Sequence, residues 1–386
     1  MKQTFQQASL QFQKEIAKYF PERIDEIELL FAINSSHMLP QISQNISLFL
    51  LGNPSTGKST CLELLKSLPN ILWRDGITPA ALVSGTRDMD PSEMLLYQLP
   101  NRTLIIPEFA PLANSTNAKQ IFANFTRLLD SNGMVLHFGT TGALGFSAAM
   151  KFNLLGAAVR FDQKTWEMMT TMGPRLVFLR LKNSKKSVSE ISQQLTKISK
   201  ERNYAEKLEI GRKLILAFHE KITKIYPDGL TINPEKDDSK TLLEIANLAQ
   251  LLSALRGKVV KVGRDFSNET IIEDPKRVFT TLVSIARCLS FIRGRSYISE
   301  NELPMIRRLV FDSAEPGRIE ILKNLISHDS LSTSKLVKIT GLSRATIYRK
   351  FTEFVLLGLA TFNKKSGKTK PESIIILASE WDWLKE

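Results

Sequence analysis

The residue pattern with the clearest chemistry lies close to position 55. Residues 52–59 fit G-x-x-x-x-G-K-S, a loop whose glycines let the backbone curl around an anion. In such a loop, successive N–H groups point at phosphate oxygens, Lys58 lies between the β- and γ-phosphates, and the Ser59 hydroxyl ligates Mg²⁺. The sequence therefore predicts a site for ATP and Mg²⁺. The residues expected at the nucleotide are Gly52, Asn53, Pro54, Ser55, Thr56, Gly57, Lys58, Ser59 and Thr60.

The segments around this phosphate loop (residues 52–59) are those that the motif requires. An apolar run at 46–51 precedes it and a helical pattern follows it. A second apolar run, 103–106, would carry Glu108 to a strand end beside the loop, where its carboxylate orients or deprotonates the attacking water. Pro107 stands where such strands normally carry an Asp for the metal, so Mg²⁺ would depend on the loop serine and the phosphates. A purely structural Glu108 is the alternative.

Short apolar runs that alternate with helical patterns predict an α/β domain with a largely parallel sheet. The predicted strands are 46–51, 103–106, 134–138, 153–159 and 176–181. Residues 1–45, which Pro21 and Pro40 interrupt, predict two or three amphipathic helices that pack on this domain. After Lys182 the strand pattern gives way to helical patterns separated by polar segments. The expected units are an N-terminal helical segment 1–45, an α/β core 46–182, a helical region 183–316 and a C-terminal domain 317–386.

The C-terminal domain predicts helix, helix, turn, helix and two strands, which is the plan of a winged helix. Ser343 is a good N-cap for a helix that starts at Arg344, and the exposed face of such a helix can enter a major groove. The basic segment 363–370 would be a wing on the phosphate backbone. The expected DNA contacts are Arg344, Thr346, Tyr348, Arg349, Lys350, Lys364, Lys365 and Lys368. Protein docking by this domain stays open as an alternative.

Composition narrows the class of protein further. The 386 residues include 52 Lys and Arg against 39 Asp and Glu, a formal charge of +13, which favours a polyanionic partner such as DNA. Cys61 and Cys288 make no disulfide framework, and the four histidines show no metal-ligand spacing. No apolar run approaches the roughly 20 residues that cross a bilayer. We therefore expect a soluble cytoplasmic protein without a membrane partner.

Beyond the phosphate loop, the order of motifs resembles the AAA+ ATPase superfamily and, within it, the minichromosome maintenance (MCM) helicase branch. The resemblance covers residues 46–313. It includes a hairpin formed by 134–138, a glycine-bearing turn at 139–147 and 151–158, which in that branch points into a central pore. It also includes an insertion around 85–90, an arginine-finger segment at 172–178 with Arg175, and a lid helix that begins at 274–278 with a sensor arginine, Arg277.

The chain departs from this branch at several positions. Val159 and Arg160 end the sensor strand in place of Asn or Thr, the pore turn lacks a lysine, and Pro107 replaces an Asp. About 45 residues before the core would not hold a separate oligonucleotide-binding domain, so a full replicative MCM is not expected. The alternative interpretation of Arg175 and Arg277 is that both are ordinary solvated surface charges.

The resemblance implies an AAA+ fold with a three-layer sheet, a helical lid at 183–316 and a C-terminal winged helix. It also implies a homo-oligomeric ring such as a hexamer, with Arg175 acting on the neighbouring subunit's nucleotide and Arg277 on either subunit's. The function expected is a DNA-dependent ATPase, most concretely a ring helicase or translocase in replication of a mobile or extrachromosomal element. The alternatives are an ATP-gated DNA-binding regulator with weak or no hydrolysis, and a protein-remodelling ATPase.

Overall fold

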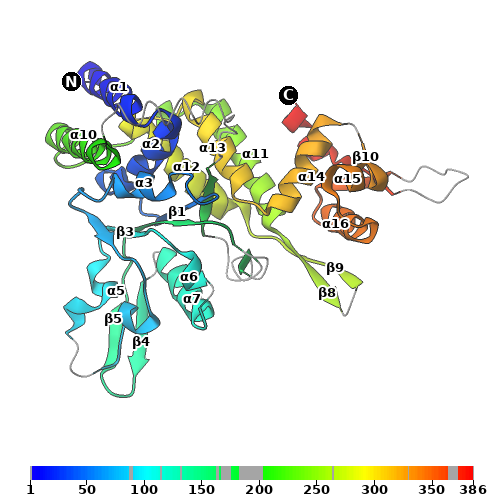
Figure 1. Cartoon of the computed structure of the whole chain (residues 1–386), viewed down its shortest axis with the longest axis horizontal. Coiled ribbons are helices and arrows are strands. Elements are labelled where there is room, and N and C mark those ends of the chain that lie inside the picture. The colour runs from blue at the N-terminus through cyan, green and yellow to red at the C-terminus, as the bar shows by residue number, and fades with distance from the viewer. Residues whose placement is uncertain are drawn as a thin grey trace, which may run out of the picture.

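A parallel sheet forms the centre of the molecule in the computed structural model of the chain (Figure 1). The structure describes residues 2–86, 90–113, 115–130, 133–161, 165–166, 175–181, 203–262, 265–328, 330–363 and 373–385. Within them, the central sheet has five strands in the order β2-β3-β6-β1-β7, and every neighbouring pair is parallel. The strands are β1 (Ile46–Leu51), β2 (Ile71–Trp73), β3 (Thr103–Ile106), β6 (Asn153–Ala158) and β7 (Val177–Arg180). The predicted α/β class with a largely parallel sheet is confirmed.

Two layers of helices cover the sheet. Side chains alternate across β1, so that Leu48 and Leu50 belong to one buried cluster and Phe49 and Leu51 to another. The first cluster includes α2 (Ile24–Asn34), α3 (Lys58–Glu63) and α12 (Pro275–Ile292). The second includes the short helices α4 (Pro79–Leu82), α5 (Leu95–Gln98) and α6 (Ala110–Ala113), together with α7 (Ala118–Leu129). A sheet with a core on each face accounts for strands that are apolar throughout.

The predicted N-terminal helices are present and pack on the core. They are α1 (Lys2–Tyr19), the 3₁₀ turns η1 (Pro21–Arg23) and η2 (Ser35–Met38), and α2 between those turns. Pro21 opens η1, as expected for a residue that cannot continue the preceding helix. Phe12 of α1 stacks on Phe218 of α10 (Tyr204–Ile225), with ring centroids 4.4 Å apart. The segment therefore belongs to the main hydrophobic core.

The described part of residues 203–315 is helical, with one exception. Its helices are α10, η4 (Pro234–Lys236), α11 (Ser239–Arg256), α12, η5 (Glu300–Glu302) and α13 (Leu303–Asp312). The exception is an unpredicted hairpin, β8 (Lys258–Val262) with β9 (Asp265–Ile271), which projects beside the C-terminal domain in Figure 1. Ion pairs join this region to α2: Arg293 to Glu28 at 2.7 Å and Arg308 to Glu26 at 2.7 Å. No helix in the described part of the chain is both long and apolar enough to span a membrane.

The prediction for residues 134–158 is wrong in its pairing. β4 (Met134–Phe138) is not a strand of the central sheet, but pairs with β5 (Gly142–Phe146) in a separate antiparallel hairpin. The return strand of the hairpin is therefore 142–146, inside the expected turn, while 153–158 belongs to the central sheet. An apolar run of five residues does not reveal its partner, because periodicity alone cannot separate a central strand from a hairpin.

The C-terminal domain has the predicted order of elements. They are α14 (Pro316–Ser327), β10 (Leu331–Ser332), α15 (Thr333–Thr340), α16 (Arg344–Leu356), β11 (Ala360–Asn363), β12 (Ile374–Leu377) and η6 (Ser379–Lys385). The strands form a small antiparallel sheet in the order β10-β12-β11, of which β10 was not predicted. Gly341 ends α15 in the left-handed region (φ 69°), and the Ser343 hydroxyl accepts a hydrogen bond from the Thr346 N–H, capping α16 as expected.

Candidate nucleotide site and nucleic-acid surface

The phosphate loop connects β1 directly to α3, and its two motif glycines are required by geometry. A Cβ on Gly52 would lie 2.9 Å from the Leu181 carbonyl oxygen and 3.0 Å from the Thr56 hydroxyl. Gly57 caps α3 with φ +85°, in the left-handed region that favours glycine. The chain therefore passes through a tight, inward-curling turn at the carboxyl edge of the sheet, meaning the edge where the parallel strands end. Glycines at both ends of such a turn are what a phosphate-binding loop requires.

Lys58 lies inside this loop. Its side chain is 7% exposed, and its ammonium donates hydrogen bonds to the carbonyl oxygens of Gly52 at 2.6 Å and Asn53 at 2.9 Å. Burial lowers the pKa of the ammonium, and the nearby carboxylate of Glu108 opposes that shift. Ser59, the predicted Mg²⁺ ligand, is exposed beside it. Because the described residues offer no cluster of three or more His, Cys, Asp or Glu side chains, Mg²⁺ here would need phosphate oxygens as further ligands.

Glu108 and the end of β6 reach the same edge of the sheet. The Phe109 N–H donates to the Ala157 carbonyl at 2.7 Å, and the Gly52 N–H donates to the Ala158 carbonyl at 3.3 Å. These bonds bring residue 108 and residues 159–160 next to the phosphate loop. Glu108 is exposed, as a group that contacts water must be, and Pro107 between it and β3 is only partly buried.

Arg175 and Arg277 lie together, but at the amino edge of the sheet, where the parallel strands begin. The guanidinium of Arg175 pairs with both carboxylate oxygens of Asp130, and Nη2 of Arg277 lies 3.8 Å from the same carboxylate. Together with Glu273, these side chains line a cavity of about 710 Å³. We call Asp130, Arg175, Glu273 and Arg277 the arginine cluster.

Glu273 is the acid in this cluster that lacks a hydrogen bond. Neither of its buried carboxylate oxygens has a hydrogen-bond partner among the described residues, and the nearest cation, Arg256, is 3.9 Å away. Burial raises the pKa of Glu273 to about 7, against the opposing charges of three nearby arginines. The cavity thus holds more positive than negative charge when Glu273 is protonated.

The two groups of predicted residues cannot serve one nucleotide within a single chain. Gly52 packs against Leu181, just beyond the end of β7, whereas Arg175 precedes the first residue of β7. Arg175 lies beside Ser47, at the start of β1, and Leu181 lies beyond its end, so about six extended residues, or about 20 Å, separate these two points. A guanidinium that is also turned toward Asp130 cannot span that distance.

Sequence reasoning missed three residues at these sites. The Nε of Arg23, from the N-terminal segment, donates to the Thr56 carbonyl of the phosphate loop at 2.9 Å. The Tyr204 hydroxyl, at the start of α10, lies 2.8 Å from the Thr60 hydroxyl. Asp130 is the partner of both arginines. Each is far in sequence from the group it contacts, so no local pattern could have indicated it.

The exposed face of α16 includes most, but not all, of the predicted DNA contacts. Arg344, Tyr348 and Arg349 are exposed, and Thr346 is half-buried against the capping Ser343. Lys350 is less exposed than expected: its side chain is 20% exposed, and its ammonium lies 3.7 Å from Glu315, the residue before α14. Lys350 follows the buried Ile347 by three residues, which turns it toward the domain interior. The predicted wing contacts Lys364, Lys365 and Lys368 lie outside the described residues.

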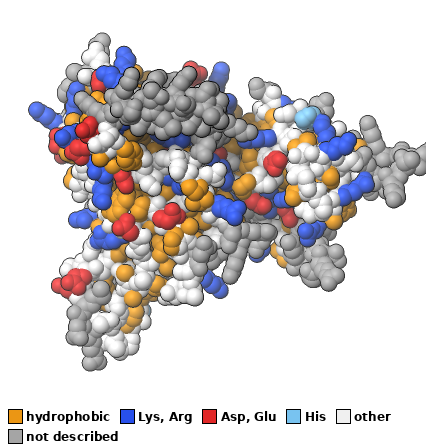
Figure 2. Space-filling view, in the orientation of Figure 1, with side chains coloured by type: hydrophobic (Ala, Val, Ile, Leu, Met, Phe, Trp, Pro, Cys, Tyr) orange, Lys and Arg blue, Asp and Glu red, His pale blue; other side chains and the backbone are white. Residues whose placement is uncertain are grey.

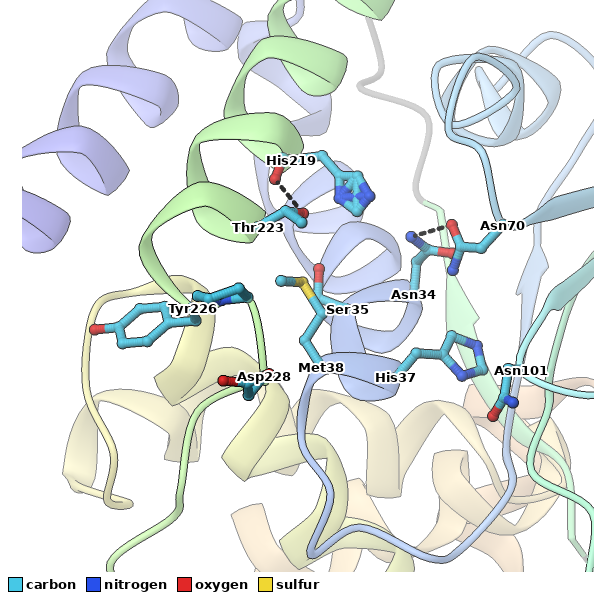
Figure 3. A pocket seen from close by; sticks show the side chains of 12 residues that line it. Asn34, Ser35, His37, Met38, Asn70, Asn101, His219, Thr223, Tyr226 and Asp228 are labelled. Carbon is cyan, nitrogen blue, oxygen red and sulfur yellow. Dashed lines mark hydrogen bonds between the residues drawn. The ribbon is translucent and has the colours of Figure 1, made fainter.

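A further cavity of about 400 Å³ lies between η2, the end of α10 and the amino edge of the sheet (Figure 3). Asn34, Asn70 and Asn101 contribute amides to its lining, and His37 and His219 contribute imidazoles. Burial lowers the pKa of His37 to about 4, so that this ring is neutral at pH 7. None of its described lining residues is Lys or Arg, which makes it a poor phosphate site.

Comparisons with known proteins add no relative. The chain matches no model of a protein family, and a search of curated proteins finds no significant similarity.

Proposed function

We propose that the chain is an ATPase of the AAA+ class that acts on DNA, and that its subunits form a ring in which each ATP site is completed by the neighbouring copy. The observation that carries the proposal is the arrangement of the sheet. A phosphate loop occupies its carboxyl edge, and a pair of arginines occupies its amino edge.

ATP binding is supported by the cradle around Lys58. The ammonium already lies inside the loop, held by two carbonyl oxygens, so phosphate oxygens could take their place with little movement of the side chain. Backbone N–H groups of the loop would add further donors. When bound, Mg²⁺ would offset the negative charge of the phosphates, and the Ser59 hydroxyl is the protein ligand available to it.

Hydrolysis is supported by the position of Glu108, an exposed carboxylate next to the loop. It would orient the attacking water or accept its proton. Arg160 is exposed two residues beyond the end of β6, the strand between β1 and β3, so it is available to contact the same phosphate.

A shared site is supported by the distance between the loop and the arginine cluster. Arg175 and Arg277 lie too far from their own loop, yet they line a cavity of about 710 Å³ that would receive the phosphates of a nucleotide held by another copy. Guanidinium groups stabilise charge on a transferring phosphoryl group, and a single arginine finger contributes about 10³–10⁵ in rate.

DNA as the partner is supported by charge and by the C-terminal domain. The chain carries a net charge of +13, and α16 presents exposed arginines near its N-terminus, as a recognition helix does. A ring that couples hydrolysis to movement along DNA, as in replication of a mobile or extrachromosomal element, is the most specific form of the proposal.

One observation favours a second function. Pro107 follows β3 where an Asp would hold the metal, and it provides no acceptor. Slow or absent hydrolysis would make the protein an ATP-gated DNA-binding regulator.

ATP hydrolysis by the purified chain, with and without single- and double-stranded DNA at low and moderate salt, separates these functions. DNA-stimulated turnover that weakens as salt rises supports the ATPase. ATP-dependent DNA binding without turnover supports the regulator, and turnover that ignores DNA contradicts the proposed partner.

A further inference from the structure

Two aromatic rings on the C-terminal domain face water instead of the core. Tyr348 of α16 is 52% exposed and Phe362 of β11 is 37% exposed. Their ring centroids are 6.4 Å apart, and their planes differ by 26°. By contrast, Phe351 and Phe354 on the same helix are fully buried. The core of the domain is therefore complete without this pair, and the hydrophobic effect does not explain its exposure.

Positive charge surrounds the pair. Arg344 lies four residues before Tyr348, on the same face of α16, and Arg349 is adjacent; both are exposed. Neither has an ion pair in the described part of the chain, whereas Arg318 lies 3.7 Å from Glu353 and Lys350 lies 3.7 Å from Glu315. The space-filling view shows basic side chains interspersed with hydrophobic ones over this domain, at the right of Figure 2.

Exposed aromatic rings beside arginines suit one ligand better than others. Unpaired nucleic-acid bases stack on aromatic side chains while the backbone phosphates follow the positive charge. In duplex DNA the faces of the bases are already stacked on each other, so a ring can contact only base edges, such as the thymine methyl group. A hydrophobic protein partner would not need the neighbouring cations.

We propose that Tyr348 and Phe362 form a stacking platform for unpaired bases, so that the C-terminal domain binds single-stranded DNA more tightly than duplex DNA. This inference rests on the proposed function, in which DNA is the partner, and adds the form of DNA that this surface takes. Arg344 and Arg349 position the phosphates on either side of the stacked bases.

The test compares the affinity of the full chain for a single strand of about 16 nucleotides and for the matching duplex, without nucleotide. Tyr348→Leu and Phe362→Leu keep an apolar side chain but remove the π-face. Each should weaken single-strand binding by roughly 5- to 150-fold, the value of one stacked base, and change duplex binding less than about twofold. Tyr348→Phe keeps the ring and should retain single-strand affinity. The fluorescence of a 2-aminopurine base in the strand should be quenched by stacking on the parent protein. This quenching should be lost with the leucine variants.

The outcomes separate this inference from the function on which it rests. Leucine variants that bind the single strand as tightly as the parent, or that lose both forms of DNA equally, overturn the stacking platform. A parent that hydrolyses ATP and binds only duplex DNA overturns the platform and leaves the proposed function intact. A parent that binds neither form contradicts DNA as the partner. Unchanged melting temperatures, expected for exposed positions, show that the variants are folded.

Discussion

The phosphate loop and the arginine cluster lie at opposite edges of one sheet, and the chain builds them in different ways. The loop is eight consecutive residues, 52–59, whose glycines fix its shape locally. The arginine cluster joins residues as distant as 130 and 277, and it exists only when the chain is folded. The cations at the two edges also have different partners. Lys58 contacts only carbonyl oxygens among the contacts described, whereas Arg175 is already paired with Asp130.

Under the proposed function, the two edges would act differently. The loop would accept an anion in an isolated subunit, because a phosphate would replace neutral carbonyl partners. Arg175 would have to exchange or share the carboxylate of Asp130 before it acted on a phosphate. In that proposal Asp130 is a positioning residue for Arg175.

The largest effect is expected at the loop. Lys58→Ala should reduce ATP turnover by more than about 10³-fold, since it removes the charge that contacts the β- and γ-phosphates. ATP hydrolysis and nucleotide affinity are the measurements, and nucleotide-free DNA binding should stay within about twofold because α16 is untouched.

Lys213→Ala is the matched control for this prediction. Its side chain is 75% exposed on α10 and pairs only with Glu209 among the ion pairs described. It should hydrolyse ATP like the parent. Normal turnover by Lys58→Ala would show that the loop is not the nucleotide site.

A contrasting effect is expected at the arginine cluster. Arg175→Ala should lower kcat by about 10³-fold or more while ATP affinity stays within a few-fold, because in the proposed ring this arginine acts on a neighbour's transition state and not on its own nucleotide. Asp130→Asn should cost about 10-fold in kcat, as one carboxylate of the pairing is weakened. Steady-state kinetics and equilibrium ATP binding distinguish the two parameters. Loss of ATP affinity in Arg175→Ala would contradict the proposal that only the loop edge binds the nucleotide of its own subunit.

Much of the loop edge could be predicted from sequence, and little of the arginine edge could. The motif at 52–59 and the strand at 103–106 are each a run of consecutive residues. The residue types and their spacing within each run are therefore sufficient to predict its structure. The pairing of Arg175 with Asp130, the contact of Arg23 with the loop and the hairpin β8–β9 depend on contacts between distant segments. The pattern at 134–138 correctly indicates a strand but does not indicate its sheet, because the partner of the strand is set by tertiary packing.

Glu273 adds a pH dependence to the arginine edge of the sheet. Its pKa is raised from 4.5 to about 7, so the folded state binds a proton that the unfolded state releases. The folded chain should therefore lose stability as pH rises from about 4.5 through 7. Glu273→Gln cannot ionise and should gain roughly 1–3 kcal/mol relative to the parent over this range.

Urea unfolding between pH 4.5 and 8 measures this difference, with the exposed Glu235→Gln as control. The attraction of Arg256 for the ionised carboxylate of Glu273 is already part of this pKa, since it opposes the shift that burial causes. If the free energy of unfolding changed with pH in the same way for the parent and Glu273→Gln, the raised pKa of Glu273 would be contradicted.

The smallest effect is expected on α16. Arg349→Ala should weaken duplex binding several-fold and lower the salt slope by about 1, as loss of one phosphate contact does. Lys350→Ala should change it less than about twofold, because that ammonium faces Glu315. Binding titrations at several salt concentrations measure both. Equal losses would mean that Lys350 reaches the DNA.

The most direct test of a site shared between copies is a mixing experiment. Arg175→Ala keeps an intact loop and Glu108, whereas Glu108→Gln keeps an intact arginine cluster; each alone should hydrolyse ATP poorly. A mixture of the two purified variants should hydrolyse ATP well above the sum of their separate rates, because some neighbours combine the two intact edges. A mixture that is no faster than that sum would contradict the shared site.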